Sequence, residues 1–216
     1  HVSMVQGELA VKAVEILSAA GSCNAGMQAL KYCYLSVLSG NTQNAISFGS
    51  EKLSSWMHAK NFDIESENWK NLEENPILAF DKDFLRWMLS DGAGAALIEN
   101  KPNKKGISLK IEWMEFRSYS NELETCMYAG GEKQEDGSIK PWRDHEPAEL
   151  MSKSLFSLRQ DVKILGENII KKGGEFLREV IKKQDFNIDE ISYFLPHLSS
   201  EYFRKHMIED LASHQI

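Results

Sequence analysis

Apolar positions in the first fifty residues predict a strand, a helix and a second strand. Residues 13–19 and 45–48 are short apolar runs with little alternation, which is typical of buried strands. Residues 24–38 between them have the period of a helix with a largely apolar surface. A strand, a helix and a strand in this order form a βαβ unit, so the pattern predicts an α/β protein with a parallel sheet.

The same periodicities predict further elements along the rest of the chain. We expect helices at 2–10, 150–184 (with an interruption at Gly173-Gly174) and 199–211 (capped by Ser199), and strands at 84–90, 95–99, 107–119 and 191–195. Residues 91–94 predict a tight glycine turn. Residues 61–75 are polar and predict a surface segment, and 128–147 are rich in Gly, Asp, Glu and Pro and predict a loop. Neither a repeat nor a composition shift marks a second domain.

The bend between the first strand and the helix carries a cysteine. Cys23 follows Gly21 and precedes Gly26, and such small residues permit a sharp turn and close approach by a substrate. Unpaired backbone N–H groups and the macrodipole at a helix N-terminus favour the nucleophilic thiolate. The arrangement is similar to the nucleophile elbow of serine hydrolases. The sequence therefore predicts a nucleophile at Cys23, and the alternative is a small buried side chain.

A histidine follows the apolar run at 191–195. His197 comes directly after Pro196 and just before the last helix, where the active sites of α/β proteins gather. The alternative is a hydrogen-bonded core or capping histidine. The other histidines are expected at the surface: His1, His58, His145, His206 and His214. No two histidines have the spacing of metal ligands with a carboxylate, so we expect no metal and no cofactor.

Composition narrows the classes of function. Hydrophobic residues make up 42% and charged residues 26%, which is ordinary for a globular protein, and the formal net charge of −7 disfavours a nucleic-acid surface. The three cysteines form neither a disulfide framework nor a zinc motif, which is typical of a protein in a reducing, cytoplasmic compartment. Cys33 and Cys126 lack the bend that surrounds Cys23, and they are interpreted as structural. We expect no membrane span and no signal peptide.

Four segments in order resemble one enzyme family. They carry the cysteine bend, a strand ending in Gly-Ser-Glu, an Asp-Gly-Ala-Gly-Ala stretch and a Pro-His pair, at 21–26, 45–51, 89–95 and 194–197. Together they are similar to the ketoacyl-ACP synthase III (beta-ketoacyl-acyl-carrier-protein synthase III) family of the thiolase-like fold. The resemblance implies duplicated βα halves in layered α-β-α-β-α order. It also implies that residues 1–216 are an internal segment, lacking the family's N-terminal and C-terminal portions.

The resemblance assigns roles to two residues. Cys23 would accept an acyl group as a thioester, and its backbone N–H would contribute to the oxyanion hole. His197 would donate a hydrogen bond to the thioester carbonyl of a malonyl-type extender and so stabilise the enolate formed on loss of CO₂. The family's third residue, an asparagine, has no counterpart between His197 and Ile216.

The implied reaction is a decarboxylative Claisen condensation in fatty acid or polyketide-like synthesis. The implied partners are an acyl-CoA or acyl carrier protein thioester and malonyl-acyl carrier protein. Two alternatives stay open: an acyltransferase or thioester hydrolase on the same fold, and a non-catalytic partner subunit of a synthase dimer. The joint presence of Cys23 and His197 counts against the partner subunit. A homodimer is expected, because pairing across a two-fold axis would cover the apolar edge at 45–48.

Overall fold

The computed structural model of the chain describes residues 2–58, 60, 85 and 88–214. The chain divides into two compact units, which are described separately. Unit 1 comprises His1–Lys52 and Asp91–Met114, and unit 2 comprises Leu53–Ser90 and Glu115–Ile216. Both units contain helices and antiparallel strand pairs, so the protein mixes the two kinds of element, as the sequence predicts.

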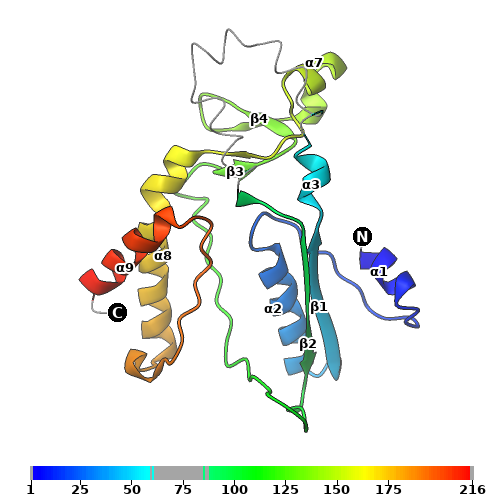
Figure 1. Ribbon diagram of the computed structural model, residues 1–216, viewed down its shortest axis with the longest axis vertical. Coiled ribbons are helices and arrows are strands. Elements are labelled where there is room, and N and C mark those ends of the chain that lie inside the picture. Colours follow the sequence, from blue (N-terminus) through cyan, green and yellow to red (C-terminus); the bar gives the residue numbers. More distant parts are fainter. Residues whose placement is uncertain (1, 59, 61–84, 86–87, 215–216) are drawn as a thin grey trace. The chain divides into compact units, whose positions relative to one another are not determined.

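Unit 1 is built on one strand pair and the helix beside it. Its elements are α1 (Val2–Glu8), α2 (Ala25–Leu38), β1 (Asn44–Glu51) and β2 (Gly92–Glu99). β1 and β2 pair antiparallel along their whole length, and α2 packs along them (Figure 1). Ser47 on β1 is buried, whereas Ile46 and its partner Leu97 lie on the opposite face and are 56% and 59% exposed. The face that carries Ile46 and Leu97 is therefore open and apolar, whereas on the other face Ser47 is buried and its partner Ala96 is exposed.

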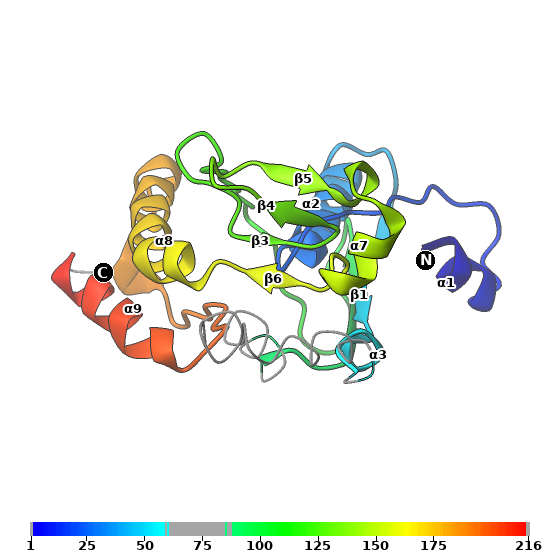
Figure 2. The same ribbon diagram turned by 90° about the horizontal axis from the view of Figure 1, so that it is seen from above.

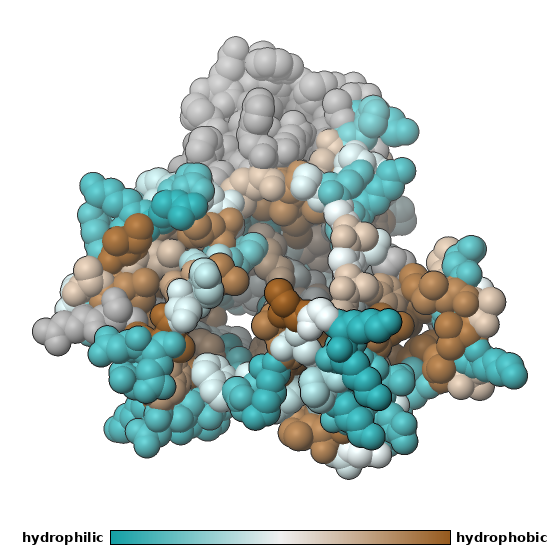
Figure 3. All heavy atoms as spheres, turned by 60° about the horizontal axis from the view of Figure 1, so that its bottom comes forward, coloured by the Kyte–Doolittle hydropathy of each residue, from teal (hydrophilic) through white to brown (hydrophobic). Residues whose placement is uncertain are grey.

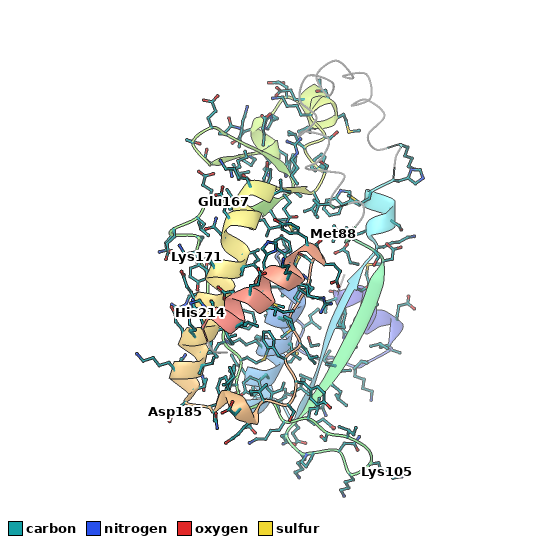
Figure 4. All side chains as sticks on the ribbon, turned by 60° about the vertical axis from the view of Figure 1, so that its left-hand side comes forward. Met88, Lys105, Glu167, Lys171, Asp185 and His214 are labelled. Carbon is teal, nitrogen blue, oxygen red and sulfur yellow. The ribbon has the colours of Figure 1, made fainter. Side chains whose placement is uncertain are left out.

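The pairing in unit 1 corrects two predictions. β1 is antiparallel to β2 instead of parallel to 13–19, and residues 13–19 are extended without joining a sheet. The predicted turn at 91–94 is also wrong, because Gly92 and Gly94 lie inside β2, opposite Glu51 and Gly49. Eight continuous cross-strand pairs with β1 outweigh the local preference of glycine for a turn. The loop that follows β2 carries Lys105 at its tip (Figure 4).

Unit 2 combines short strand pairs with two longer helices. Its elements are α3 (Leu53–Trp56), β3 (Met127–Tyr128), β4 (Gly131–Lys133), β5 (Ile139–Pro141), the 3-10 helix η2 (Trp142–Asp144), α7 (Pro147–Ser152), β6 (Arg159–Gln160), α8 (Val162–Gln184), the 3-10 helix η3 (Ile188–Glu190) and α9 (Tyr202–Ser213). β3 pairs with β6 and β4 with β5, both antiparallel. Helices α8 and α9 lie side by side (Figure 2).

Helix α8 begins at a charged cap and ends at a left-handed residue. The Asp161 side chain accepts a hydrogen bond from the backbone N–H of Ile164 at 3.0 Å and pairs with Lys133 at 2.9 Å. Burial raises the pKa of Asp161, but the bonds from Ile164 and Lys133 outweigh it and hold that pKa below its usual range. Asp185, at the other end, has φ +48° (Figure 4). These caps define the limits of the helix.

The predicted interruption of this helix at Gly173-Gly174 is wrong. Helix α8 is continuous through both glycines. A Cβ at Gly174 would lie 2.2 Å from Oδ2 of Asp210 on α9, and Arg178 pairs with the same carboxylate at 3.8 Å. Gly174 therefore allows the close approach of α9, which compensates for the roughly 1 kcal/mol that a glycine costs inside a helix.

Other predicted boundaries in unit 2 also change. The predicted helix at 150–184 is divided into α7, β6 and α8, and the segment at 128–147 contains the short strands β4 and β5. The last helix is preceded by Glu201 instead of Ser199, and the Ser200 hydroxyl accepts a hydrogen bond from the N–H of Tyr202 at 3.2 Å. The segment predicted at 61–75 lies outside the described residues, as does most of 84–90, in which Leu85 and Met88 are helical.

Three predicted strands join no sheet of the described residues: 13–19, 107–119 and 191–195. Several of their apolar side chains are open to solvent; Ile107 is 91% exposed and Leu195 is 87% exposed. Figure 3 shows brown apolar side chains at the surface in several places. A strand exists only when a neighbour satisfies its backbone, and no such neighbour occurs within the described ranges. The prediction that 191–195 is buried is therefore wrong for this chain.

Candidate functional site

Cys23 lies in unit 1, in the turn directly before α2, and its side chain is exposed. Gly21 has φ +150°, and a Cβ there would lie 3.1 Å from Oδ1 of Asn24. Asn24, at the N-cap, makes no capping bond with its side chain; its Oδ1 accepts a hydrogen bond from Nε2 of Gln28 at 3.2 Å. The predicted position of the cysteine at a helix N-terminus is confirmed. The alternative of a buried side chain is wrong.

The other cysteines have different surroundings. Cys33 is half-buried within α2, and burial raises the pKa of its thiol. Cys126 is also half-buried, and its Sγ donates a hydrogen bond to the backbone carbonyl of Asp161 at 3.4 Å. Burial is the larger cause that raises the pKa of this thiol, and the negative charge of Asp161 raises it further. Both groups therefore favour the neutral thiol, and the interpretation of Cys33 and Cys126 as structural agrees with these positions.

His197 lies in unit 2, in the connection between η3 and α9, and it is exposed. Its position just before the last helix is as predicted, although no strand precedes it. The alternative of a core histidine is wrong, since the side chain is open to solvent. Cys23 and His197 belong to different units, so neither unit alone brings the two side chains together.

A shallow hollow in unit 2 contains neither residue. It is lined by Tyr119, Ser120, Leu123, Glu124, Thr125 and Gly137. Gly137 has φ +81°, and a Cβ there would lie 2.5 Å from the Glu124 side chain. The hollow is therefore the place where a tight turn meets Glu124, and neither Cys23 nor His197 is among its lining residues.

His145 is a functional candidate that the sequence reasoning missed. It is predicted at the surface, but its side chain is completely buried. Nδ1 lies 3.3 Å from Glu149 and Nε2 lies 3.9 Å from Glu132. The prediction is wrong because α7 and β4 cover the imidazole from two sides. The position of Glu149 four residues after His145, on a helix that begins at Pro147, is the signal that could have identified the pair.

Two kinds of feature are absent from the described part of the chain. No group of three histidine, cysteine, aspartate or glutamate side chains there could hold a metal ion. None of the helices in those ranges combines the length and the apolar character needed to cross a bilayer.

Comparison with known proteins identifies a structural relative. No family model matches the chain, and no curated protein is significantly similar to it in sequence. Among solved structures, the chain is similar to AbyA1, a tetronic acid condensing enzyme, with a TM-score of 0.64 and 16% sequence identity. The match covers 99% of this chain and 55% of AbyA1. This protein therefore shares the fold of a condensing enzyme over about half of that enzyme's length.

Proposed function

We propose that the chain is part of a β-ketoacyl synthase of the thiolase-like fold. The observation that carries the proposal is the exposed thiol of Cys23 at the start of α2, in a chain whose fold is that of a condensing enzyme. Small residues on both sides of Cys23 permit the close approach of a thioester to the exposed sulfur. A helix N-terminus is a suitable place for the negative charge that develops during acyl transfer.

The first step is acyl transfer to Cys23. The thiolate attacks the thioester carbonyl of an acyl-CoA or an acyl carrier protein, and a C–S bond to Cys23 forms. The tetrahedral oxyanion accepts hydrogen bonds from backbone N–H groups at the bend, including that of Cys23. The old C–S bond then breaks, and the carrier thiol leaves with a proton. The acyl group remains on the enzyme as a thioester.

The second step forms the carbon–carbon bond. The malonyl-type thioester loses CO₂, and the electron pair of the broken bond moves onto the thioester carbonyl as an enolate. His197 donates a hydrogen bond to that oxygen and stabilises the charge. The enolate carbon attacks the acyl carbonyl on Cys23, a C–C bond forms and the C–S bond to Cys23 breaks. The product is a 3-ketoacyl thioester, and the thiolate of Cys23 is regenerated.

The unpaired segments support a larger assembly. We propose that 13–19 and 191–195 pair with strands from other parts of a longer protein, and that these parts supply an asparagine next to His197. The match to only 55% of AbyA1 agrees with this proposal. We further propose a cytoplasmic homodimer, in which pairing of sheet edges satisfies exposed backbone N–H and C=O groups and covers apolar side chains.

Selective alkylation distinguishes a catalytic protein from a non-catalytic partner subunit. With limiting iodoacetamide at neutral pH, we expect the peptide that contains Cys23 to be carboxamidomethylated at least about tenfold faster than those containing Cys33 and Cys126. Iodoacetamide can reach the exposed sulfur of Cys23, whereas the thiols of Cys33 and Cys126 are half-buried and their raised pKa values keep them neutral. Peptide mapping by mass spectrometry gives the three rates in one sample. Equal rates, or slower labelling of Cys23, would contradict the proposed nucleophile.

A further inference from the structure

The loop that follows β2 in unit 1 carries a cluster of positive charge. Residues 100–111 contain neither aspartate nor glutamate, and their charged side chains are Lys101, Lys104, Lys105 and Lys110. Every residue from 101 to 110 is exposed, and Lys105 lies at the tip of the loop (Figure 4). Lys110 pairs with Glu112 at 2.7 Å, whereas the other three lysines form no ion pair within the described residues. The loop is therefore a positive surface on a chain whose formal net charge is −7.

The loop is held in shape by its own hydrogen bonds. The backbone N–H of Lys105 donates to Oδ1 of Asn103 at 3.1 Å, and the backbone N–H of Asn103 donates to Oγ of Ser108 at 3.2 Å. At the base of the loop, the N–H of Asn100 donates to the carbonyl of Gln43 at 3.2 Å, in the turn between α2 and β1. This turn carries no charged residue that could neutralise the lysines. Because the loop is already folded back on itself, binding a partner orders little further backbone.

Two aliphatic side chains come directly after the tip. Ile107 is 91% exposed and Leu109 is 89% exposed, the highest values among the large hydrophobic side chains of the described residues. Lysines precede and follow them in the chain. Exposed aliphatic groups among lysines suit a surface that is negatively charged outside and apolar beneath, because a lysine stem can lie along apolar material while its ammonium group stays in water.

The size of the loop favours a lipid surface over an acidic protein as the partner. A stable protein–protein interface buries about 800 Å² on each side and takes about 20–30 residues from each partner. The exposed segment at 101–110 is much smaller than this. A bilayer, in contrast, accepts a few inserted side chains, and each lysine near an anionic surface strengthens binding by roughly fivefold.

We propose that the loop at residues 101–110 binds the surface of an anionic lipid bilayer, with Ile107 and Leu109 among the acyl chains and the lysines against the headgroups. The negative charge elsewhere on the chain is screened beyond a Debye length of about 8 Å at physiological salt, so the charges nearest the membrane dominate. This binding is independent of the proposed reaction, because neither Cys23 nor His197 belongs to the loop.

Cosedimentation with lipid vesicles tests the proposal on the protein that contains the whole chain. Vesicles of phosphatidylcholine alone are compared with vesicles of equal parts phosphatidylcholine and phosphatidylglycerol. In about 0.1 M salt we expect the wild type to bind the anionic vesicles at least about tenfold more tightly, and in about 1 M salt this preference should disappear through screening.

Charge-neutralising variants locate the binding surface. Lys104→Gln combined with Lys105→Gln should weaken binding to anionic vesicles by about thirtyfold, roughly fivefold for each lysine. Lys163→Gln combined with Lys171→Gln is the matched control, because both lysines are exposed on α8 and their loss changes the net charge equally. A wild type without preference for anionic vesicles, or a control that loses as much binding as the loop variant, would overturn the proposal.

The aliphatic side chains distinguish insertion into a bilayer from attraction by charge alone. Ile107→Ser combined with Leu109→Ser should weaken binding to anionic vesicles by about tenfold and should keep its salt dependence. Because all the substituted side chains are exposed, we expect every variant to fold like the wild type, which circular dichroism checks. A serine variant that binds as tightly as the wild type would also overturn the proposal and would indicate a purely electrostatic surface, such as one for an acidic protein.

Discussion

Replacing Cys23 by alanine is expected to abolish formation of an acyl-enzyme. In the wild type, exposure to an acyl thioester should add the mass of one acyl group, because the exposed sulfur at the start of α2 attacks the thioester carbonyl. Alanine has no nucleophile, and the helix N-terminus cannot retain the acyl group without a covalent bond. Intact-mass spectrometry measures the adduct directly, and the expected decrease is complete.

The other cysteines provide matched controls. Cys33→Ala and Cys126→Ala should keep the full mass shift, because both thiols are half-buried and their pKa values are raised. Loss of the adduct in either control, together with its persistence in Cys23→Ala, would assign the nucleophile to a different cysteine. An unchanged mass shift in Cys23→Ala would be enough to reject the proposed mechanism.

Replacing His197 by alanine is expected to separate the two half-reactions. Cys23 should still be acylated, whereas release of CO₂ from a malonyl thioester should decrease by about a hundredfold or more, the usual effect of losing one donor to a developing oxyanion. The physical reason is that His197 stabilises the enolate, which does not exist during acyl transfer. Labelled CO₂ and the acyl-enzyme mass are measured on the same preparation.

A conservative variant and a distant histidine sharpen this test. His197→Gln keeps an N–H donor on a side chain of similar reach and should recover part of the decarboxylation rate. His206→Ala, which changes an exposed histidine on α9, should leave both half-reactions unchanged. If His197→Ala reduces acylation and decarboxylation equally, then His197 has a structural or general-base role that both steps share.

The helices were the most predictable part of the fold. The periodicity at 24–38 predicts α2 at Ala25–Leu38 almost residue for residue, and the pattern ending at Leu211 predicts α9. An α-helix satisfies its own backbone, so its limits depend mainly on residues within the same segment. Gly173-Gly174 led to the wrong prediction of a break in α8. Helix α9 packs against Gly174 and offsets the helix-weakening effect of the glycines, and this contact joins residues that are distant in sequence.

Strands could not be predicted equally well, because their hydrogen bonds connect distant segments. The sequence gives no direct sign that Glu51 lies opposite Gly92, and this register places the expected turn inside β2. The apolar runs at 13–19 and 191–195 have the composition of strands, yet they stay unpaired in the described chain. Composition indicates that a segment can be a strand, whereas the presence of a neighbour decides whether it is one.

The candidate site was predictable where its signal is local. Glycines on both sides of Cys23 and a helical pattern after it identify an exposed cysteine at a helix N-terminus. His145 has only its pairing with Glu149 as a local signal; its approach to Glu132 could not be predicted, because Glu132 lies on a different element, β4. The chemistry of a bend can thus be predicted from a few residues, but that of a buried cluster requires the fold.

The product of the reaction tests the central claim most directly. The protein that contains these 216 residues is incubated with an acyl thioester and a ¹³C-labelled malonyl thioester, and the products are identified by mass spectrometry. A β-ketoacyl synthase should release labelled CO₂ and a 3-ketoacyl thioester longer by two carbons, in equal amounts and only when Cys23 is present. Transfer or hydrolysis of the acyl group without CO₂ release and without a new carbon–carbon bond would contradict the account.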